Sequence, residues 1–341
     1  MSILTRRAFL KVAGATGAAL MTGCVVREAD APSAPGSPST GDSGLLAAPD
    51  EIVITPTGSL YIQSYSSRPT VQGEAWQLRV HGLVDRPRNL SLADVQAYPK
   101  VESVRTLECI GNPVGGSLIG NIVWGGFEAQ ALWDEVGIQL QARRARFEAE
   151  DDYTTSVLMK WITQPGVLLV YEMNGEPLPA AHGYPLRILM PGLYGQKMPK
   201  WIREIEFIDF DHRGYWESRG WSDVASVQTN SIIQQPQGLE RLPQSDVPIF
   251  GVAFAGLRRI TGVDVRLDEG DWMPAELIQA DSPLTWTQWA FDWPADPGRH
   301  KIAVRATDEA GFVQSTEADS VLSSSYPAGT DRIHSVVVTV A

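Results

Sequence analysis

The chain has little cysteine, because only Cys24 and Cys109 occur among its 341 residues. No disulfide is expected, since Cys24 falls in a segment that processing would consume. Thiolate-rich zinc sites, iron–sulfur clusters and C-x-x-C-H haem attachment all need more cysteines than remain. Any metal bound by this chain must therefore bring most of its own ligands.

Positive charge is also scarce. The chain has 28 Lys and Arg against 40 Asp and Glu, which gives a net charge of −12 and a pI near 4.9. This charge opposes binding to phosphate backbones, and no basic run is interleaved with aromatic residues. We therefore expect no nucleic-acid partner. A length of 341 residues with 43% hydrophobic content is enough for two globular domains after a leader.

Residues 1–24 have the pattern of a twin-arginine (Tat) export signal. Arg6-Arg7 is followed by an apolar run over residues 12–21, which is too short to span a bilayer because about 20 residues are needed. The run ends in a possible lipobox at Cys24, with Met21 in place of the usual leucine. Lipidation of Cys24 and ordinary cleavage both stay open. Residues 25–50 are rich in Pro, Ser and Gly and predict a flexible linker. The expected location is the periplasm or cell envelope, with a lipid anchor if Cys24 is acylated.

Residues 51–224 mix strand-like and helix-like patterns, which predicts an α+β domain. Residues 76–80 alternate as a half-buried strand does, and Ser91 has the character of a helix N-cap. Helices are predicted over residues 128–136 and 155–162, and an apolar strand over residues 167–173.

Residues 225–341 carry short strands at regular spacing. Strands are predicted over residues 249–255, 263–267, 285–293, 300–307 and 334–340. This pattern is typical of an immunoglobulin-like β-sandwich. No group of catalytic residues gathers in this half of the chain.

Cys109 stands before a loop rich in glycine and containing proline, residues 110–116. The loop has neither the Walker pattern nor G-x-G-x-x-G, which disfavours nucleotide binding. A lone cysteine is often a small buried apolar residue. As a thiolate it could also bind a metal whose other ligands come from a cofactor. A nucleophilic cysteine would need a histidine base, and His182 alone among five histidines lies in a recognisable motif.

Several ordered blocks of the chain resemble the molybdopterin domain of the sulfite oxidase family. They are Leu107-x-Cys109-x-Gly111-Asn112, Ile119-Gly120-Asn121-x-x-Trp124-x-Gly126, His182-Gly183-Tyr184-Pro185-Leu186-Arg187, Pro191-Gly192-x-Tyr194-Gly195 and Lys200-Trp201. The resemblance covers about residues 50 to 220, and the second domain is similar to the family's molybdenum cofactor dimerisation domain.

The resemblance implies a molybdenum–molybdopterin cofactor with Cys109 as the protein ligand to the metal. It also implies that His182, Arg187 and Lys200 contact the pterin and its phosphate, and that Asn121 lies near the cofactor. Arg and Lys are suitable donors for a buried phosphate. A homodimer is expected from the second domain.

Two positions depart from the family pattern. Family members often have Arg-Arg directly after the Cys-x-Gly-Asn unit, where this chain has Pro113-Val114, and Trp221 stands where the family's active-site tyrosine would fall. These departures argue against sulfite as the physiological substrate. Arg105, Arg213 or Arg219 are the remaining candidates to supply positive charge to the pocket.

The sequence therefore predicts a molybdenum-pterin oxidoreductase that transfers oxygen atoms, with a small oxyanion or sulfur-containing substrate. The metal does the redox chemistry. Because no haem or flavin motif is present, a separate carrier such as a cytochrome must exchange the electrons. Two alternatives stay open here: a reductase of sulfoxides on the same cofactor, and a non-enzymatic binding lipoprotein of the envelope. A glycosidase using Asp151-Asp152 is weaker, because carboxylates adjacent in sequence usually face apart.

Overall fold

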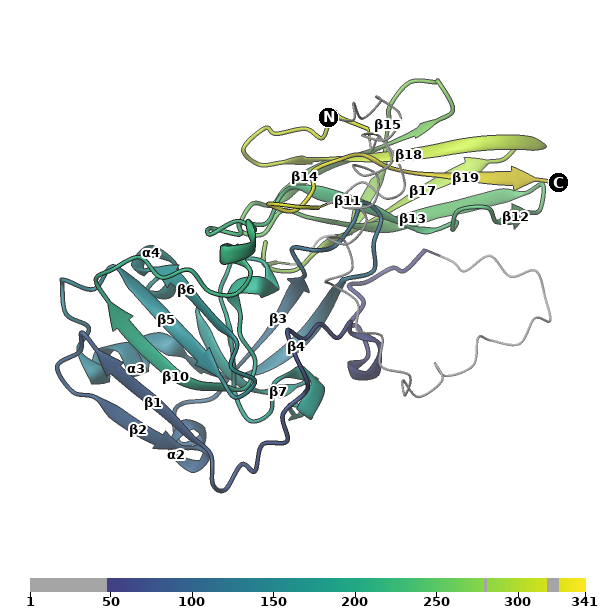
Figure 1. Ribbon diagram of the computed structural model, residues 1–341. Coiled ribbons are helices and arrows are strands. Elements are labelled where there is room, and N and C mark those ends of the chain that lie inside the picture. Colours follow the sequence, from purple (N-terminus) through teal and green to yellow (C-terminus); the bar gives the residue numbers. More distant parts are fainter. Residues whose placement is uncertain (1–47, 279–280, 318–324) are drawn as a thin grey trace, which may run out of the picture. The chain divides into compact units, whose positions relative to one another are not determined.

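The computed structural model describes residues 48–278, 281–317 and 325–341. The predicted signal peptide and residues 25–47 of the predicted linker lie outside this range. Strands dominate the described residues, and the helices are few and short (Figure 1). No helix in the described part of the chain has the length and hydropathy that crossing a bilayer requires.

The first domain contains two sheets. The first sheet has the order β2-β1-β10-β5-β6 and the second has the order β3-β4-β7-β8, with β9 paired to β7. The strands are β1 (Gln77–Gly82), β2 (Arg88–Ser91), β3 (Val101–Glu108), β4 (Ile119–Glu128), β5 (Arg144–Ala149), β6 (Thr154–Leu158), β7 (Leu168–Met173), β8 (Glu176–Pro177), β9 (Arg187–Leu189) and β10 (Ile202–Ile208). The helices are α2 (Leu92–Gln96), α3 (Ala129–Val136) and α4 (Met159–Ile162), with 3-10 turns η1 (Thr57–Ser59), η2 (Ala180–His182), η3 (Gly195–Lys197) and η4 (Glu217–Arg219).

Local sequence accounts for most of these elements. Leu78 and Val80 are fully buried while Arg79 points outward, as the alternation predicted for β1. Ser91 caps α2 in a capping box with Asp94. Gly137 ends α3 with a φ of 66°, which is a left-handed C-cap.

The helix predicted over residues 155–162 is wrong. The chain forms β6 over Thr154–Leu158 and only a four-residue helix, α4, after it. Thr154, Thr155 and Val157 are β-branched, and such side chains favour a strand paired to a neighbour, here β5. Pairing with β5 therefore decides that residues 154–158 form a strand and not a helix.

The second domain consists of two mainly antiparallel sheets, of order β11-β13-β17-β16 and β12-β19-β18-β14-β15. Their strands are β11 (Asn230–Gln235), β12 (Arg241–Leu242), β13 (Asp246–Phe254), β14 (Ile260–Leu267), β15 (Met273–Pro274), β16 (Glu276–Ile278), β17 (Thr287–Pro294), β18 (Gly298–Asp308) and β19 (His334–Val340). Each of the five strands predicted here overlaps one of them. Both sheets contribute to one apolar core, with Trp289 from one sheet and Ile302 from the other almost fully buried.

Strand β3 also joins the two domains. The Thr106 N–H donates to the carbonyl of Leu284 at 2.8 Å, and the Trp286 N–H donates to the Thr106 hydroxyl at 2.8 Å. Thr106 lies three residues before Cys109, so these bonds attach the second domain close to that cysteine.

Candidate molybdenum cofactor site

Cys109 follows directly after β3, in the loop of residues 109–118 that leads into β4. The Cys109 N–H donates to the carbonyl of Leu118 at 2.9 Å and closes the loop. The Gly111 N–H lies 3.4 Å from Cys109 Sγ, and the cysteine is partly exposed. A backbone N–H directed at sulfur favours the thiolate, which is the form that binds metals.

Three tyrosines, the partly buried Tyr61 and the buried Tyr153 and Tyr194, lie close enough to Cys109 for its charge to affect their pKa values. Burial is the main cause that raises the pKa of Tyr61, Tyr153 and Tyr194, and the negative charge of Cys109 contributes to each shift. Their hydroxyls therefore stay protonated at neutral pH. The ring of Trp221 lies 4.0 Å from the position that a Cβ on Gly111 would occupy. Aromatic side chains thus form the walls beside the thiol.

His182, Arg187 and Lys200, which the family resemblance implies as cofactor contacts, lie close together in the structure. Arg187 Nη1 donates to the carbonyl of His182 at 3.1 Å, and Lys200 Nζ donates to the carbonyl of Ala181 at 2.9 Å. Gly183 has a φ of 117°, and a Cβ there would lie 3.1 Å from Lys200 Cβ and 3.2 Å from Arg187 Cβ. Only glycine adopts this turn readily and lets both cations approach it.

This cluster holds one buried cation, Arg187, and one partly buried cation, Lys200. Burial lowers the pKa of Arg187 to about 10. Burial and the charge of Arg187 lower the pKa of Lys200 to about 7 and that of His182 to about 4. Within the described ranges no salt bridge involves Arg187 or Lys200, and Arg187 Nε is buried without a hydrogen-bond partner. A buried anion would supply both the missing charge and the missing acceptor.

The pKa of Tyr61 is affected by the charges of both the cation cluster and Cys109. The pKa of its hydroxyl is raised mainly by burial, next by the charge of Cys109, and is lowered by the charge of Arg187. Tyr61, which is partly buried, therefore lies near enough to both groups for their charges to affect its pKa. A ligand that contacts Cys109 at one end and the cations at the other would pass beside Tyr61.

Asn121 lies elsewhere in the hydrogen-bond network. Its side chain donates to the carbonyl of Val53 at 3.3 Å and accepts from the Thr106 hydroxyl at 3.3 Å, and its N–H donates to the Thr55 hydroxyl at 3.0 Å. These bonds hold the N-terminal segment against β4. Contact between Asn121 and the cofactor stays a prediction.

Two arginines considered from the sequence are engaged elsewhere. Arg105 Nε donates to the Ser103 hydroxyl at 3.1 Å, and its Nη1 donates to the carbonyl of Gly166. The Arg219 guanidinium lies over the Tyr215 ring, 3.4 Å from Cζ to the ring centroid. Sequence reasoning missed Tyr61 and Tyr153, which carry no motif signal.

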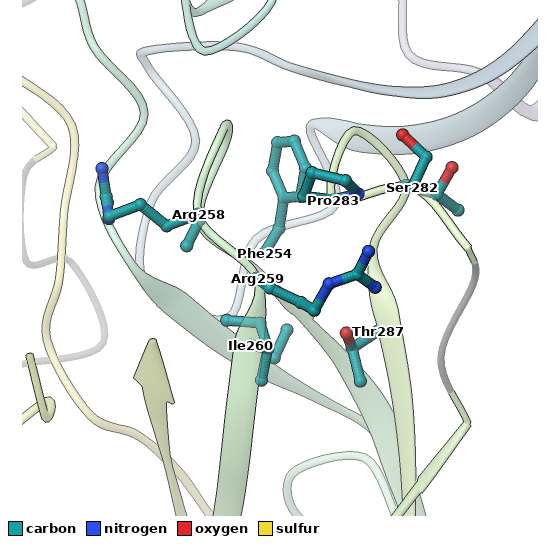
Figure 2. A pocket seen from close by; sticks show the side chains of 10 residues that line it. Phe254, Arg258, Arg259, Ile260, Ser282, Pro283 and Thr287 are labelled. Carbon is teal, nitrogen blue, oxygen red and sulfur yellow. The ribbon is translucent and has the colours of Figure 1, made fainter. Parts of the chain in front are cut away.

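Two other groupings in the described residues do not form the site. His81, Glu204 and Glu206 could hold an ion, but Arg146 Nη1 already lies 3.3 and 3.1 Å from the two carboxylates. Figure 2 shows a hollow in the second domain, where Arg258 and Arg259 point in opposite directions. Its volume of about 10 Å³ has room for one water.

A buried ion pair also lies in the first domain. Lys197 Nζ contacts Glu217 Oε1 with both side chains at 1% exposure or less, and it donates to the carbonyl of Ser156 at 3.1 Å. Gln196 Nε2 donates to the same Glu217 oxygen at 3.2 Å. A pair with so little exposure depends on both partners.

Comparison with known proteins gives a consistent result. The family model "Oxidoreductase molybdopterin binding domain" matches residues 65–216, and "Mo-co oxidoreductase dimerisation domain" matches residues 222–325. Sulfite oxidase of Arabidopsis thaliana is 29% identical over 329 residues, which cover 79% of this chain and 84% of the relative. The uncharacterised oxidoreductase YuiH of Bacillus subtilis is 39% identical over 146 residues, covering 43% of this chain and 72% of the relative. The solved sulfane dehydrogenase SoxCD of Paracoccus pantotrophus has the same fold, with a TM-score of 0.74 at 24% identity over 84% of this chain and 83% of that one.

Proposed function

The chain belongs to the sulfite oxidase family of molybdopterin-dependent oxidoreductases, and from this premise we propose that Cys109 is the protein ligand to its molybdenum. The protein is an enzyme of oxygen-atom transfer that uses a molybdenum–molybdopterin cofactor. The comparisons favour neither a sulfoxide reductase nor a non-enzymatic binding lipoprotein. The partly exposed Cys109 thiol, and the cation cluster whose charge reaches the same tyrosine, Tyr61, support the assignment of the site.

The described residues fit the cofactor. When bound, the molybdenum–pterin group supplies oxygen-atom transfer and two-electron chemistry. The loop of residues 109–118 would hold the Cys109 sulfur for the metal, and the Gly111 N–H would stabilise its thiolate form. Arg187 and Lys200 offer charged donors to the phosphate, with Arg187 Nε still without an acceptor. His182, whose pKa is lowered to about 4, is neutral at pH 7 and can donate or accept one hydrogen bond.

For the substrate we propose a small sulfur compound whose lone pair accepts the oxygen, with a cytochrome as the separate electron carrier. The departures at Pro113, Val114 and Trp221 argue against sulfite itself. Dye reduction driven by sulfite and by uncharged thioethers, compared with sulfoxide-driven oxidation of a reduced dye, tests the class and the direction. Turnover with the sulfoxide alone would contradict the proposed direction.

We propose a symmetric homodimer formed through the second domain, because that domain matches a dimerisation model. Light scattering at micromolar concentration should give twice the chain mass. A monomer would contradict the proposal.

We also propose that residues 51–224 form an α+β domain and that residues 225–341 form a sandwich of immunoglobulin type, since the two sheets of residues 225–341 share one core.

For its location we propose export by the Tat pathway to the periplasm or envelope, with lipidation of Cys24 as one of two processing outcomes. Support comes from Arg6-Arg7 and the apolar run after it. Replacing both arginines with lysine should leave the protein in the cytoplasm. Mass spectrometry at Cys24 distinguishes acylation from ordinary cleavage.

A further inference from the structure

Glu108, the residue before Cys109, is a buried carboxylate that receives amide donors from both domains. It ends β3 and is 4% exposed. Asn112 Nδ2 donates to Glu108 Oε1 at 3.0 Å, and Asn230 Nδ2 donates to Glu108 Oε2 at 3.1 Å. Asn112 belongs to the Cys109 loop, whereas Asn230 begins β11 of the second domain. One carboxylate therefore connects the loop to the second domain.

Asn112 extends this contact into the loop. Its Oδ1 accepts from the Leu118 N–H at 2.9 Å, and its own N–H donates to the carbonyl of Cys109 at 2.9 Å. A Cβ on Gly116 would lie 2.4 Å from Asn112 Oδ1, so the backbone packs closely against this amide. The Asn112 side chain cannot move without opening the loop that carries Cys109.

The arrangement needs an acceptor at both oxygens of residue 108. A carboxylate provides two acceptors, whereas a glutamine provides one acceptor and one donor. Glutamine would place an NH₂ group against the NH₂ of Asn112 or Asn230. Within the described ranges no salt bridge involves Glu108, and the two amide donors contact one oxygen each. A carboxylate is costly to bury, and the need for an acceptor at both oxygens accounts for its presence here.

We propose that Glu108 is a positioning residue that, through Asn112 and Asn230, holds the Cys109 loop against the second domain and so sets the direction of the Cys109 sulfur toward the metal. This inference rests on the proposed function of Cys109. The second domain would then contribute to the geometry of the metal centre in addition to any role in dimerisation.

The test is a swap of hydrogen-bond polarity. In Glu108→Gln one of the two amide contacts is lost. In Glu108→Gln combined with Asn112→Asp, the glutamine introduced at position 108 would donate to residue 112 and accept from Asn230, while residue 112 would still accept from Leu118. The double variant keeps every contact and the total charge, with one bond reversed. Asn112→Asp alone would bring two carboxylates together.

The readouts are molybdenum content, the Mo(V) electron paramagnetic resonance spectrum after dithionite reduction, and kcat and KM with ferricyanide as oxidant and the sulfite or thioether that the wild type turns over fastest in the dye assay. Because small misplacement of reacting groups can cost roughly 100-fold, we expect Glu108→Gln to lower kcat roughly 10-fold or more and to shift the Mo(V) spectrum. KM should change little. The double variant should recover the wild-type spectrum and most of kcat.

The wild-type spectrum and kcat in Glu108→Gln would overturn the proposal, as would a double variant that fails to fold or stays as impaired as the single one. If Glu108→Gln does not fold, the double variant decides alone. Molybdenum analysis of the wild type and of Cys109→Ala tests the proposed function separately. If the wild type contains molybdenum and Cys109→Ala does not, the proposed function holds whatever the Glu108 variants show.

Asn230→Ala tests whether the second domain helps to position the Cys109 loop, and Thr229→Val is its matched control. Thr229 is buried beside Asn230, but among the described residues its hydroxyl bonds Asp308 and Arg258, both within the second domain. Asn230→Ala should shift the Mo(V) spectrum in the same direction as Glu108→Gln, and Thr229→Val should leave it unchanged. If Asn230→Ala and Thr229→Val gave the same Mo(V) spectrum, the proposed link between the second domain and the metal centre would be contradicted.

Discussion

Lys200 allows a quantitative prediction about cofactor affinity. Its side chain is partly buried. Within the described residues its ammonium group donates to the carbonyls of Gln63 and Ala181 and to the Ser64 hydroxyl, and burial and the charge of Arg187 lower its pKa to about 7. We propose that the cofactor's phosphate binds there. A hydrogen bond between charged groups contributes about 1.5–3 kcal/mol, so Lys200→Met should weaken cofactor binding roughly 10-fold to 150-fold.

The same geometry predicts a pH dependence. The bound phosphate raises the pKa of Lys200 above its value of about 7 in the free protein, so binding takes up a proton whenever the pH exceeds that value. The contribution of this charge is therefore complete below pH 7 and is lost as the pH rises. Affinity should fall by up to about tenfold per pH unit above 7, until the pKa of the bound state is reached.

The assay is fluorescence titration of cofactor-free protein with molybdopterin between pH 7 and 9, where the phosphate is already dianionic. Lys160→Met is the matched control, because exposed Lys160 also lies over the ring of the next residue, Trp161, at 5.2 Å, as Lys200 lies over Trp201 at 4.2 Å. Lys160→Met should keep the wild-type affinity and slope. If Lys200→Met also kept both, the phosphate would not bind at this lysine.

Three further predictions concern buried and ionic groups. Arg187→Met removes a buried charge that lacks a counterion, so it should raise the melting temperature of the cofactor-free protein while lowering molybdenum content; a lower melting temperature would contradict the account of excess charge. Lys197→Met leaves the Glu217 carboxylate buried without its cation and should lower the free energy of unfolding in urea by about 3–5 kcal/mol. Adding Glu217→Gln should recover most of that loss. Strictly additive losses in the double variant would show that the two residues are not coupled. The pKa of His300 is raised by its hydrogen bond to Asp268, so this pair stabilises the fold below the unfolded histidine's pKa and the effect disappears as the pH rises through the folded pKa. His300→Gln should therefore cost less than about 1 kcal/mol at pH 5 and nothing at pH 9, and a constant difference would exclude titration of His300 as the cause.

The resemblance to the family pointed to His182, Arg187 and Lys200 because each stands in a short ordered block of the sequence. Their contact with the cofactor stays a prediction. Tyr61 and Tyr153 gave no such signal, since they reach Cys109 only through the pairing of distant segments. The contact between Glu108 and Asn230 joins positions 122 residues apart and is likewise invisible in any local pattern.

The prediction of secondary structure from local sequence patterns has the same limit. Strands of the second domain were predictable because alternation and turn residues are local properties. The predicted helix over residues 155–162 was wrong because β6 pairs with β5, and a local pattern does not reveal that partner. Pairing between strands decided this segment.

The most direct test of the account is elemental analysis of the protein produced with its leader in a host that makes the cofactor. The wild type should contain close to one molybdenum per chain, together with the fluorescence of the oxidised pterin. Cys109→Ala should lose the metal, and Cys109→Ser should lose nearly all turnover while keeping the fold. Full molybdenum and activity in either folded variant would show that Cys109 is not the ligand.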